Sequence, residues 1–462
     1  MAKTQSTVPE PGLDLDRARH IFEQVVQASP ADETEVTVHA TVSELTRFAN
    51  NIIHQNVAEQ SQSISVRTVI GGRMARASTN RTDEAAIREV VDRAVQLTRL
   101  QHPDPDVLPM PGPQSYRSVD RCDAETAAIT PELRAGIVRQ MVDVAEQNKL
   151  TTAGVFTNHN SFSALFNSRG LEATYGETGA EYSVTMLAEN SSGWAKGNSW
   201  RLRDLDAVAA ARSAAHKAVA SADPIEVPPG KYTVILEPAA VLDLMGFLFW
   251  DFGGLAVLDQ RSFLSDRFRT KLFGDNINIT DDVYHDLQRG APWDGEGMPR
   301  QVIPLVENGV AQNLVYARQT VGQMQKAHPD WNPAPTGHGF PLPNEYGEAP
   351  LNIVVAGGDT SVDEMIASTP RGILVTRLWY IREVDPYQKI LTGMTRDGTF
   401  LVEDGKVTRG VRNFRFNQNM VEMLKQVEAM SPSVRSTGEE SFDMVVPAMK
   451  VHNFNFTEVT RF

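Results

Sequence analysis

Apolar and polar positions repeat along this chain with two different periods, and each period predicts a different element. Stripes of apolar residues at helical spacing predict helices over 15–28, 87–95, 131–144 and 204–222. Strict alternation predicts a strand over 64–70, and Gly71-Gly72 after it predicts a hairpin into 73–77. A further long helix is expected from Pro238 through Phe249, since proline suits a first helical position and Gly253-Gly254 would end it.

Turn signals are frequent between extended runs. Asn308-Gly309 and Asp404-Gly405 lie between apolar alternating segments and predict tight hairpins, and Asn167 to Gly170 predicts another turn. Gly357-Gly358-Asp359-Thr360 follows a predicted strand but lacks the lysine of a phosphate loop, so a turn into a helix capped by Asp359 or Ser361 is expected. These patterns predict an α+β fold with mostly antiparallel sheets and flanking helices.

Two proline-rich stretches suggest the domain organisation. Residues 102–113 hold five prolines and predict a semi-rigid linker, and a second linker is expected over 223–230. We expect a disordered N-terminus at 1–13, an N-terminal α+β domain at 14–222 that contains the first linker, and a β-rich C-terminal domain at 231–462.

Composition narrows the class of function. The 462 residues carry a formal net charge of −14, which disfavours contact with nucleic acid. The single cysteine, Cys122, permits no internal disulfide and suits a reducing compartment, so a cytoplasmic protein is expected. No apolar signal core opens the chain, and the most apolar window, 241–258, contains charged residues and glycines, so no membrane span is predicted.

Several short blocks, in a characteristic order, resemble the TldD/PmbA family, also called the modulator of DNA gyrase family. They include Asn167-Ser168-Arg169-Gly170, Ser262-Phe263-Leu264, Asp294-Gly295-Glu296-Gly297, Thr336-Gly337-His338, Arg371 to Thr376, Val384-Asp385-Pro386 and Glu403 to Val407. The resemblance implies a two-domain architecture with a metallopeptidase-like C-terminal domain.

The zinc motif of TldD-type peptidases, His-Glu-x-x-x-His, falls on Gly246, Phe247 and Asp251 in this chain. Zinc needs imidazole or thiolate donors and a carboxylate beside its bound water, and Gly246 and Phe247 supply neither. The family's C-terminal cysteine is also missing, because no cysteine follows Cys122. The chain therefore resembles the PmbA/TldE branch, and we expect no catalytic residue and no metal site of its own.

Other chemistry finds little support in the sequence. The ten histidines show no metal-ligand spacing, and no serine or cysteine nucleophile motif is present. Asp243 and Asp251 lie two helical turns apart and could share a face, although solvated or paired carboxylates are the commoner outcome.

Two groups of residues are candidates for binding a peptide or a partner. His338 lies between glycines, and Gly337 before it would permit close backbone approach, although a simple loop explains the same pattern. Phe249 and Trp250 belong to an aromatic cluster that fits either core packing or a hydrophobic anchor.

The resemblance implies a zinc-less subunit that joins a zinc-bearing TldD-type partner and acts with it on unfolded or small peptides. No cofactor is expected in this chain, and the assembly could be that heterodimer or a homodimer. Two alternatives stay open: a stand-alone binding or regulatory protein resembling a gyrase modulator, or an enzyme with relocated catalytic groups. Peptide specificity, stoichiometry and pathway are not encoded in these patterns.

Overall fold

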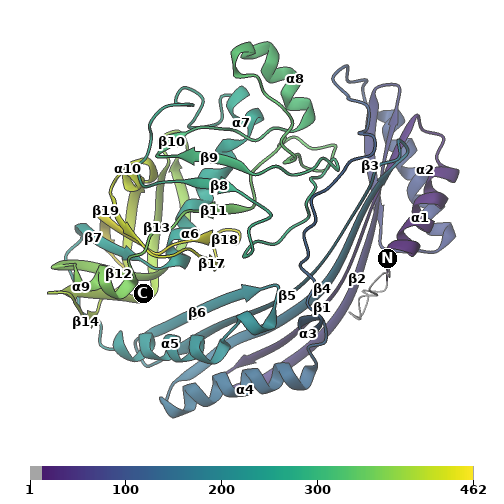
Figure 1. The fold of residues 1–462 in the computed structure, drawn as a ribbon. Helices are drawn as coiled ribbons and strands as arrows, with labels where there is room; N and C mark the ends of the chain where they lie inside the picture. Colours follow the sequence, from purple (N-terminus) through teal and green to yellow (C-terminus); the bar gives the residue numbers. More distant parts are fainter. Residues whose placement is uncertain (1–12, 461–462) are drawn as a thin grey trace.

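The computed structural model describes residues 13–460, which form the expected α+β fold on three sheets (Figure 1). Disorder was expected at 1–13, and residues 1–12 lie outside the described residues. Leu13 is described and is buried in a core cluster. Among the helices described, none is long and apolar enough to cross a membrane.

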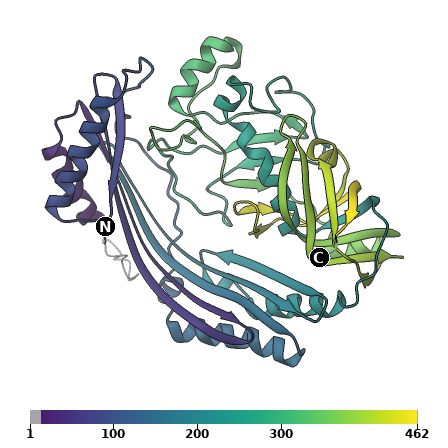
Figure 2. The same cartoon turned by 180° about the vertical axis from the view of Figure 1, so that it is seen from behind.

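The N-terminal half is built on one long, strongly curved antiparallel sheet with the strand order β3-β2-β1-β4-β5-β6. Its strands are β1 (Glu33–Ala49), β2 (Ile52–Ile70), β3 (Arg73–Thr79), β4 (Thr151–Asn167), β5 (Glu172–Leu187) and β6 (Ser192–Ser199). Figures 1 and 2 show this sheet curving around the C-terminal half.

Helices cover the outer face of this sheet in two separate groups. Near one end lie α1 (Leu15–Ala28) and α2 (Glu84–Leu100); near the other lie α3 (Ala124–Ala127), α4 (Pro131–Gln147) and α5 (Ala207–Ala220), with the short η1 (Leu202–Asp204). Each group closes its own hydrophobic core against the sheet. Apolar residues at helical spacing produce these cores, because they place one face of each helix on the sheet.

The C-terminal half contains a closed ring of five strands, since β12 pairs with both β7 and β13. The ring consists of β7 (Gly230–Leu236), β12 (Arg371–Asp385), β13 (Ile390–Glu403), β15 (Phe414–Asn419) and β19 (Met449–Val459), and β14 (Lys406–Gly410) and β16 (Val427–Met430) extend it. A third sheet joins β8 (Ile279–Asp281), β9 (Ile303–Glu307), β10 (Val310–Ala311), β11 (Ile353–Val355), β17 (Val434–Ser436) and β18 (Met444–Val446).

Short helices surround these two sheets. They are α6 (Pro238–Met245), η2 (Gly246–Phe252), α7 (Gly254–Leu258), α8 (Arg318–Ala327), η3 (Pro329–Trp331), α9 (Val362–Ala367) and α10 (Met420–Lys425). One large core cluster contains the buried faces of α6, η2 and the ring strands. The helix α6 is therefore anchored in the centre of this half.

Local sequence signals predicted the turns and helix starts correctly. Asn308 and Gly309 have φ of 46° and 75°, the left-handed backbone that an Asn-Gly hairpin requires. Ser361 and Glu364 form a reciprocal capping box at α9, which confirms the helix expected after the glycine pair. The helix from Thr130 also forms, but its buried face includes the fully buried Arg134, which is paired with Glu44.

The helix expected from Pro238 to Gly253 was wrong in its second half. The α-helix ends at Met245, the chain tightens into the 3₁₀ segment η2, and Gly253-Gly254 begins α7 instead of ending the helix. The tighter turn follows from packing, because Leu248, Phe249 and Phe252 all enter the core.

The proline-rich stretch 102–113 runs without regular secondary structure between the two halves and is held at several points. The Asp104 amide donates to the Gly72 carbonyl at 2.8 Å, and the Met110 amide donates to the Glu33 carboxylate at 2.8 Å. Arg318 of the C-terminal half donates to the Pro109 carbonyl at 2.8 Å. The stretch therefore ties the long sheet to the C-terminal half.

Candidate functional site

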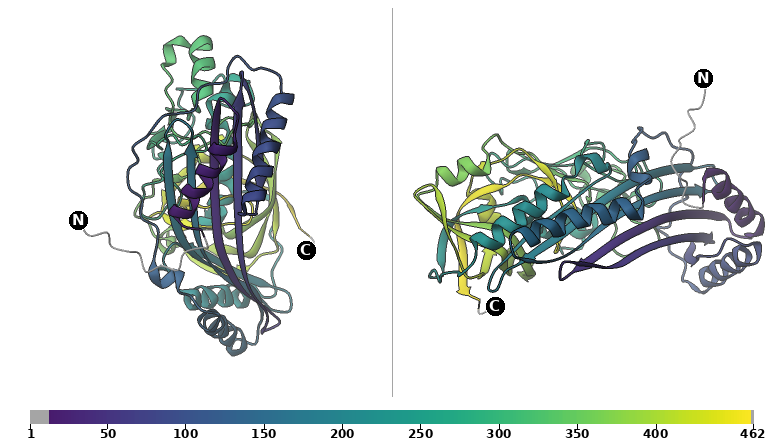
Figure 3. Two further views of the ribbon diagram at one scale, coloured as in Figure 1. Left: turned by 90° about the vertical axis from the view of Figure 1, so that its right-hand side faces the viewer. Right: turned by 90° about the horizontal axis from the view of Figure 1, so that it is seen from below.

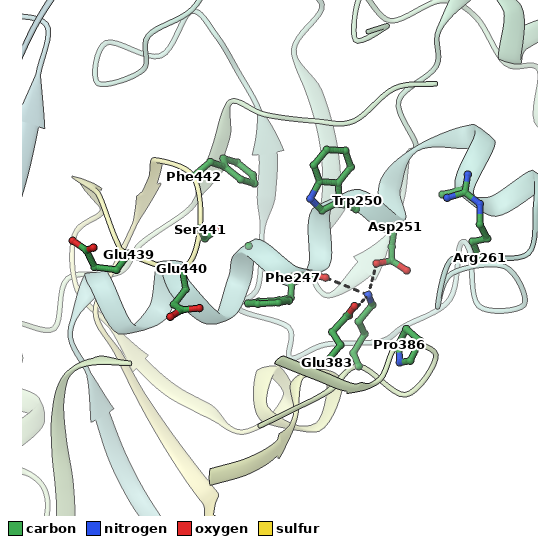
Figure 4. Close-up of a pocket in the computed structure, with 13 residues that line it drawn as sticks. Phe247, Trp250, Asp251, Arg261, Glu383, Pro386, Glu439, Glu440, Ser441 and Phe442 are labelled. Carbon is green, nitrogen blue, oxygen red and sulfur yellow. Dashed lines mark hydrogen bonds and ion pairs between the residues drawn. The ribbon is translucent and has the colours of Figure 1, made fainter. Parts of the chain in front are cut away.

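A cavity of about 740 Å³ lies at Gly246, Phe247 and Asp251, the positions onto which the resemblance places the zinc motif (Figure 4). Four parts of the C-terminal half form its walls: the η2 segment, α7 with the residues just after it, the hairpin between β12 and β13, and the loop before β18. The lining residues are Gly246, Phe247, Trp250, Asp251, Ala256, Arg261, Glu383, Pro386, Lys389, Glu439, Glu440, Ser441 and Phe442. The structure thus brings all three motif positions to one cavity.

Gly246 is the residue that lets the loop before β18 approach the helix. A Cβ atom at this position would overlap the side chain of Ser441. The tight contact explains why glycine fits where the zinc motif has histidine. It also brings Ser441, from the segment 436–446 that contains no cysteine, next to Gly246.

Phe247 and Asp251 point to different surroundings. The Phe247 ring packs against the hydrophobic core, whereas its backbone carbonyl faces the cavity. Asp251 is buried, and its Oδ1 accepts the Phe263 amide at 2.8 Å. Burial raises the pKa of Asp251, and the neighbouring ammonium of Lys389 opposes that rise.

The ammonium of Lys389 lies at the centre of this site. It forms an ion pair with Asp251, a second at 2.7 Å with Glu383, and a hydrogen bond at 3.2 Å to the Phe247 carbonyl (Figure 4). Lys389 is 3% exposed. A buried carboxylate needs a compensating positive charge, and this lysine supplies it from the turn between β12 and β13.

Asp243, the other aspartate singled out in the sequence, contacts the loop before β18 instead of Lys389. Its Oδ1 accepts the Glu440 amide at 3.1 Å, and its Oδ2 has no hydrogen-bond partner among the described residues. Burial, reinforced by the charge of Glu440, raises the pKa of Asp243 to about 7. Asp243 and Asp251 therefore do not converge on a shared ligand position.

We tested whether the residues at this site fit a zinc ion. The cavity lining contains no imidazole and no thiolate, the donors that structural and catalytic zinc sites use most. The oxygen atoms that do converge are already bound to the Lys389 ammonium. Across residues 13–460 no group of three histidine, cysteine or acidic side chains is arranged to hold a metal. The residues present do not fit zinc.

His338 and Gly337 lie away from this cavity, inside the C-terminal half. His338 is 1% exposed, and its two ring nitrogens bond to Thr336 and to Asp281, each at 3.0 Å. Gly337 has φ 74°, and a Cβ there would overlap the backbone of Pro299. The glycine permits close packing within the chain, so burial corrects our expectation that His338 contacts a peptide.

The aromatic candidates divide between core and surface. Phe249 is 1% exposed and belongs to the hydrophobic core, so core packing is the role that the structure gives it of the two left open by the sequence. Trp250 is 52% exposed, lines the cavity and lies 5.8 Å from the Phe340 ring. Trp250 is therefore the aromatic candidate that remains accessible to a ligand.

Sequence reasoning missed the residues that complete the site, which are Lys389, Glu383 and Glu440. Glu440 accepts the backbone amides of Tyr380 and Ile381 at 2.7 and 3.3 Å, and this fixes the loop against β12. The only available signal was the Val384-Asp385-Pro386 block, which lies between Glu383 and Lys389. Nothing local indicates that Lys389 meets Asp251 or that Glu440 lines the same cavity.

Solved structures of similar fold cover nearly the whole chain. TldE from Thermococcus kodakarensis matches with a TM-score of 0.84 and 20% identity, covering 96% of this chain and 99% of that one. A putative modulator of DNA gyrase from Thermotoga maritima matches with a TM-score of 0.82 and 17% identity, with coverage of 96% and 99%. These likenesses establish the fold.

Proteins with similar sequences match over half or more of this chain. A protein named Metalloprotease from Methanothermobacter thermautotrophicus is 23% identical over 382 residues, which is 77% of this chain and 78% of the relative. An uncharacterized protein of Methanocaldococcus jannaschii is 24% identical over 264 residues, a match that spans 55% of this chain and 60% of that protein's length.

Family models match along most of the chain in three consecutive segments. Metallopeptidase domain 1 matches residues 34–98, the central domain matches 125–222, and the C-terminal domain matches 229–458. The first segment corresponds to β1 to β3 with α2, the second to β4 to β6 with α4 and α5, and the third to the C-terminal half. The chain belongs to the PmbA/TldD metallopeptidase family.

Proposed function

We propose that this chain is a zinc-less, PmbA/TldE-like subunit that joins a zinc-bearing TldD-type partner and helps it to process unfolded or small peptides. In this assembly the partner supplies the zinc and the hydrolytic step. The cavity at Trp250 contributes peptide contacts, and the chain has no catalytic residue of its own. The single cysteine fits a cytoplasmic setting.

One observation carries the proposal: a lysine ammonium binds the oxygen atoms that gather at the positions onto which the resemblance places the zinc motif. Lys389 binds Asp251, Glu383 and the Phe247 carbonyl together. A divalent cation and this ammonium cannot share the same oxygen atoms, because their positive charges would repel at close range. The site therefore keeps the architecture of a family in which relatives are named metalloproteases, but not its metal chemistry.

The cavity walls suggest how the chain contacts a peptide. Trp250 and Phe442 present aromatic surface, and Glu439 and Glu440 add polar groups from the same loop as Phe442 (Figure 4). Apolar walls with a few placed polar groups are typical of ligand sites. We therefore expect a peptide side chain to enter beside Trp250.

The test compares the purified chain, a zinc-bearing TldD-type partner, and their mixture. Elemental analysis should find far less than one zinc per copy of this chain, and the chain alone should not hydrolyse unfolded peptides. The mixture should hydrolyse peptides faster than the partner alone, and Trp250→Ala should reduce this increase in rate. Tyr346→Ala is the matched control, since Tyr346 is 61% exposed but does not line the cavity.

Three results would overturn the proposal. The first is stoichiometric zinc bound to this chain, and the second is chelator-sensitive hydrolysis by the chain alone. The third is a partner that hydrolyses peptides equally well without this chain. Hydrolysis by the chain alone that resists chelators would instead favour relocated catalytic groups.

A further inference from the structure

The charged side chains around the Trp250 cavity do not balance one another. The lining contains four carboxylates and two cations: Asp251, Glu383, Glu439 and Glu440 against Arg261 and Lys389. When all of these groups are ionised, the lining has an excess of two negative charges. Residues outside the lining that join the same ion pairs leave this excess unchanged, because two are basic and two are acidic: Lys196, Arg382, Glu181 and Asp259.

Two of these carboxylates are accessible from the cavity and only partly neutralised. The side chains of Glu383 and Glu439 are each 32% exposed. Glu383 meets the Lys389 ammonium at 2.7 Å, and that ammonium also pairs with a second carboxylate. Glu439 lies 3.5 Å from the Lys196 ammonium, which is 3.6 Å from Glu181 as well. Lys196 belongs to β6, at the teal end of the long sheet that lies beside the yellow strands in the right-hand view of Figure 3. Each cation is thus shared by two carboxylates.

Trp250 adds a ring that can accept a cation. Four of the six tryptophans already lie beneath an arginine of the chain: Trp194, Trp200, Trp331 and Trp379. Trp293 is 9% exposed, whereas Trp250 is 52% exposed, and residues 13–460 place no lysine or arginine over the Trp250 ring. The face of a tryptophan attracts a cation more strongly than that of tyrosine or phenylalanine.

We propose that the Trp250 cavity binds a cationic side chain of the peptide, arginine or lysine, through its aromatic rings and the carboxylates of Glu383 and Glu439. This inference names the substrate class of the peptide site and rests on the proposed function. A long basic side chain packs its methylene stem on apolar surface and keeps its charge at polar groups. Trp250 and Phe442 supply the surface, and the two glutamates supply the polar groups.

Other side chains fit this cavity less well. An acidic side chain would be repelled by the excess negative charge. The Arg261 guanidinium does not offset this repulsion, because it lies at the opposite end from Glu439 in Figure 4 and is paired with Asp259 at 3.0 Å. A neutral side chain would gain the aromatic contact but not the attraction of the carboxylates. Arginine should bind best, since its planar group both stacks on a ring and donates to a carboxylate.

The main experiment measures peptide binding to the purified full chain alone by fluorescence anisotropy. The probes are short, dye-labelled peptides of glycine and serine with a single arginine, citrulline or glutamate at the same position. Citrulline keeps the length and shape of arginine but has no charge. We expect the arginine peptide to bind roughly fivefold to tenfold more tightly than the citrulline peptide, and the glutamate peptide to bind most weakly.

Variants of the cavity give a second readout, the ratio of the arginine and citrulline affinities. Trp250→Leu keeps an apolar side chain but removes the ring, and Glu439→Gln removes one exposed charge. Both should lower the ratio. Glu307→Gln is the matched control and should keep the wild-type ratio, because Glu307 is an exposed acid outside the cavity lining. A variant that merely folds poorly would weaken the binding of both peptides and leave the ratio as it was.

Equal affinities of the wild type for the arginine and citrulline peptides overturn the inference, and so does an unchanged ratio in both cavity variants. No binding of the arginine peptide at about 1 mM, the weak end of specific affinities, also overturns it. The proposed function is tested separately, by the hydrolysis rate of the mixture with a zinc-bearing partner. If that rate increases while the two peptides bind equally, the preference for a cation is wrong and the subunit role stands. If the preference is found without an increase in rate, the subunit role is wrong instead.

Discussion

Replacing Lys389 by methionine tests whether this ammonium neutralises the site. Methionine nearly matches the length of the side chain but removes the charge, so Asp251 and Glu383 lose their partner. Removing one partner of a buried ion pair costs about 3–5 kcal/mol, because the other charge stays buried and unpaired. The side chain of Asp251 is 6% exposed, and that of Glu383 is 32% exposed. Most of the stability lost in Lys389→Met should therefore come from the unpaired charge of Asp251.

The loss should depend on pH with a definite sign. Burial already raises the pKa of Asp251, and removing Lys389 removes the largest opposing influence. An acid with a raised pKa in the folded state binds its proton more tightly when folded, so stability falls as pH rises through that range. Lys389→Met should therefore be least stable, relative to wild type, near pH 8 and should approach wild type near pH 4.

The assay is chemical denaturation of both proteins at several pH values. Adding Asp251→Asn to Lys389→Met should recover most of the loss at pH 8, because the unpaired charge is then gone. Lys450→Met is the matched control: Lys450 is also 3% exposed, but its partner Glu428 is 42% exposed and can be solvated instead. Exposed ion pairs contribute at most about 1 kcal/mol to stability. If Lys389→Met lowers the free energy of unfolding by less than this at every pH, the reasoning is refuted.

Three further results are expected. Gly246→His should lower the free energy of unfolding by about 1–3 kcal/mol through overpacking, since any side chain there overlaps Ser441. Equilibrium dialysis of this variant should show no tight zinc binding. A stability equal to wild type would contradict the overlap. Asp243→Asn should raise the free energy of unfolding by up to about 4 kcal/mol at pH 8 and should leave it unchanged near pH 4. The wild type loses stability as pH rises from 3.8 to 7, because the pKa of Asp243 is about 7 in the folded state. Parallel pH profiles for the two proteins in denaturation experiments would speak against this shift. Limited proteolysis should first cut the proline-rich stretch near 104–108, which is exposed before the buried Met110, and mass spectrometry of the fragments identifies the site. First cuts inside 231–254 would contradict this expectation.

The candidate site could be predicted only in part from the sequence. The motif positions were visible because they lie within six residues of one helix-like stretch, Gly246 to Asp251. Lys389 lies far along the chain, in a turn whose own composition is unremarkable, so no local pattern connects it with Asp251. His338 misled us because flanking glycines indicate close approach but do not say whether a ligand or the chain itself approaches.

Local chemistry determined the helices, the tight turns and the α+β class of this protein. Capping side chains, apolar stripes and Asn-Gly pairs act within a few residues, so they can be recognised without the fold. The tertiary structure alone decided where α6 gives way to η2, which aromatic residues are buried, and that the Lys389 ammonium pairs with Asp251 and Glu383. These outcomes depend on contacts between segments far apart in the sequence, whose free energies are set by packing density and by the cost of burying charge.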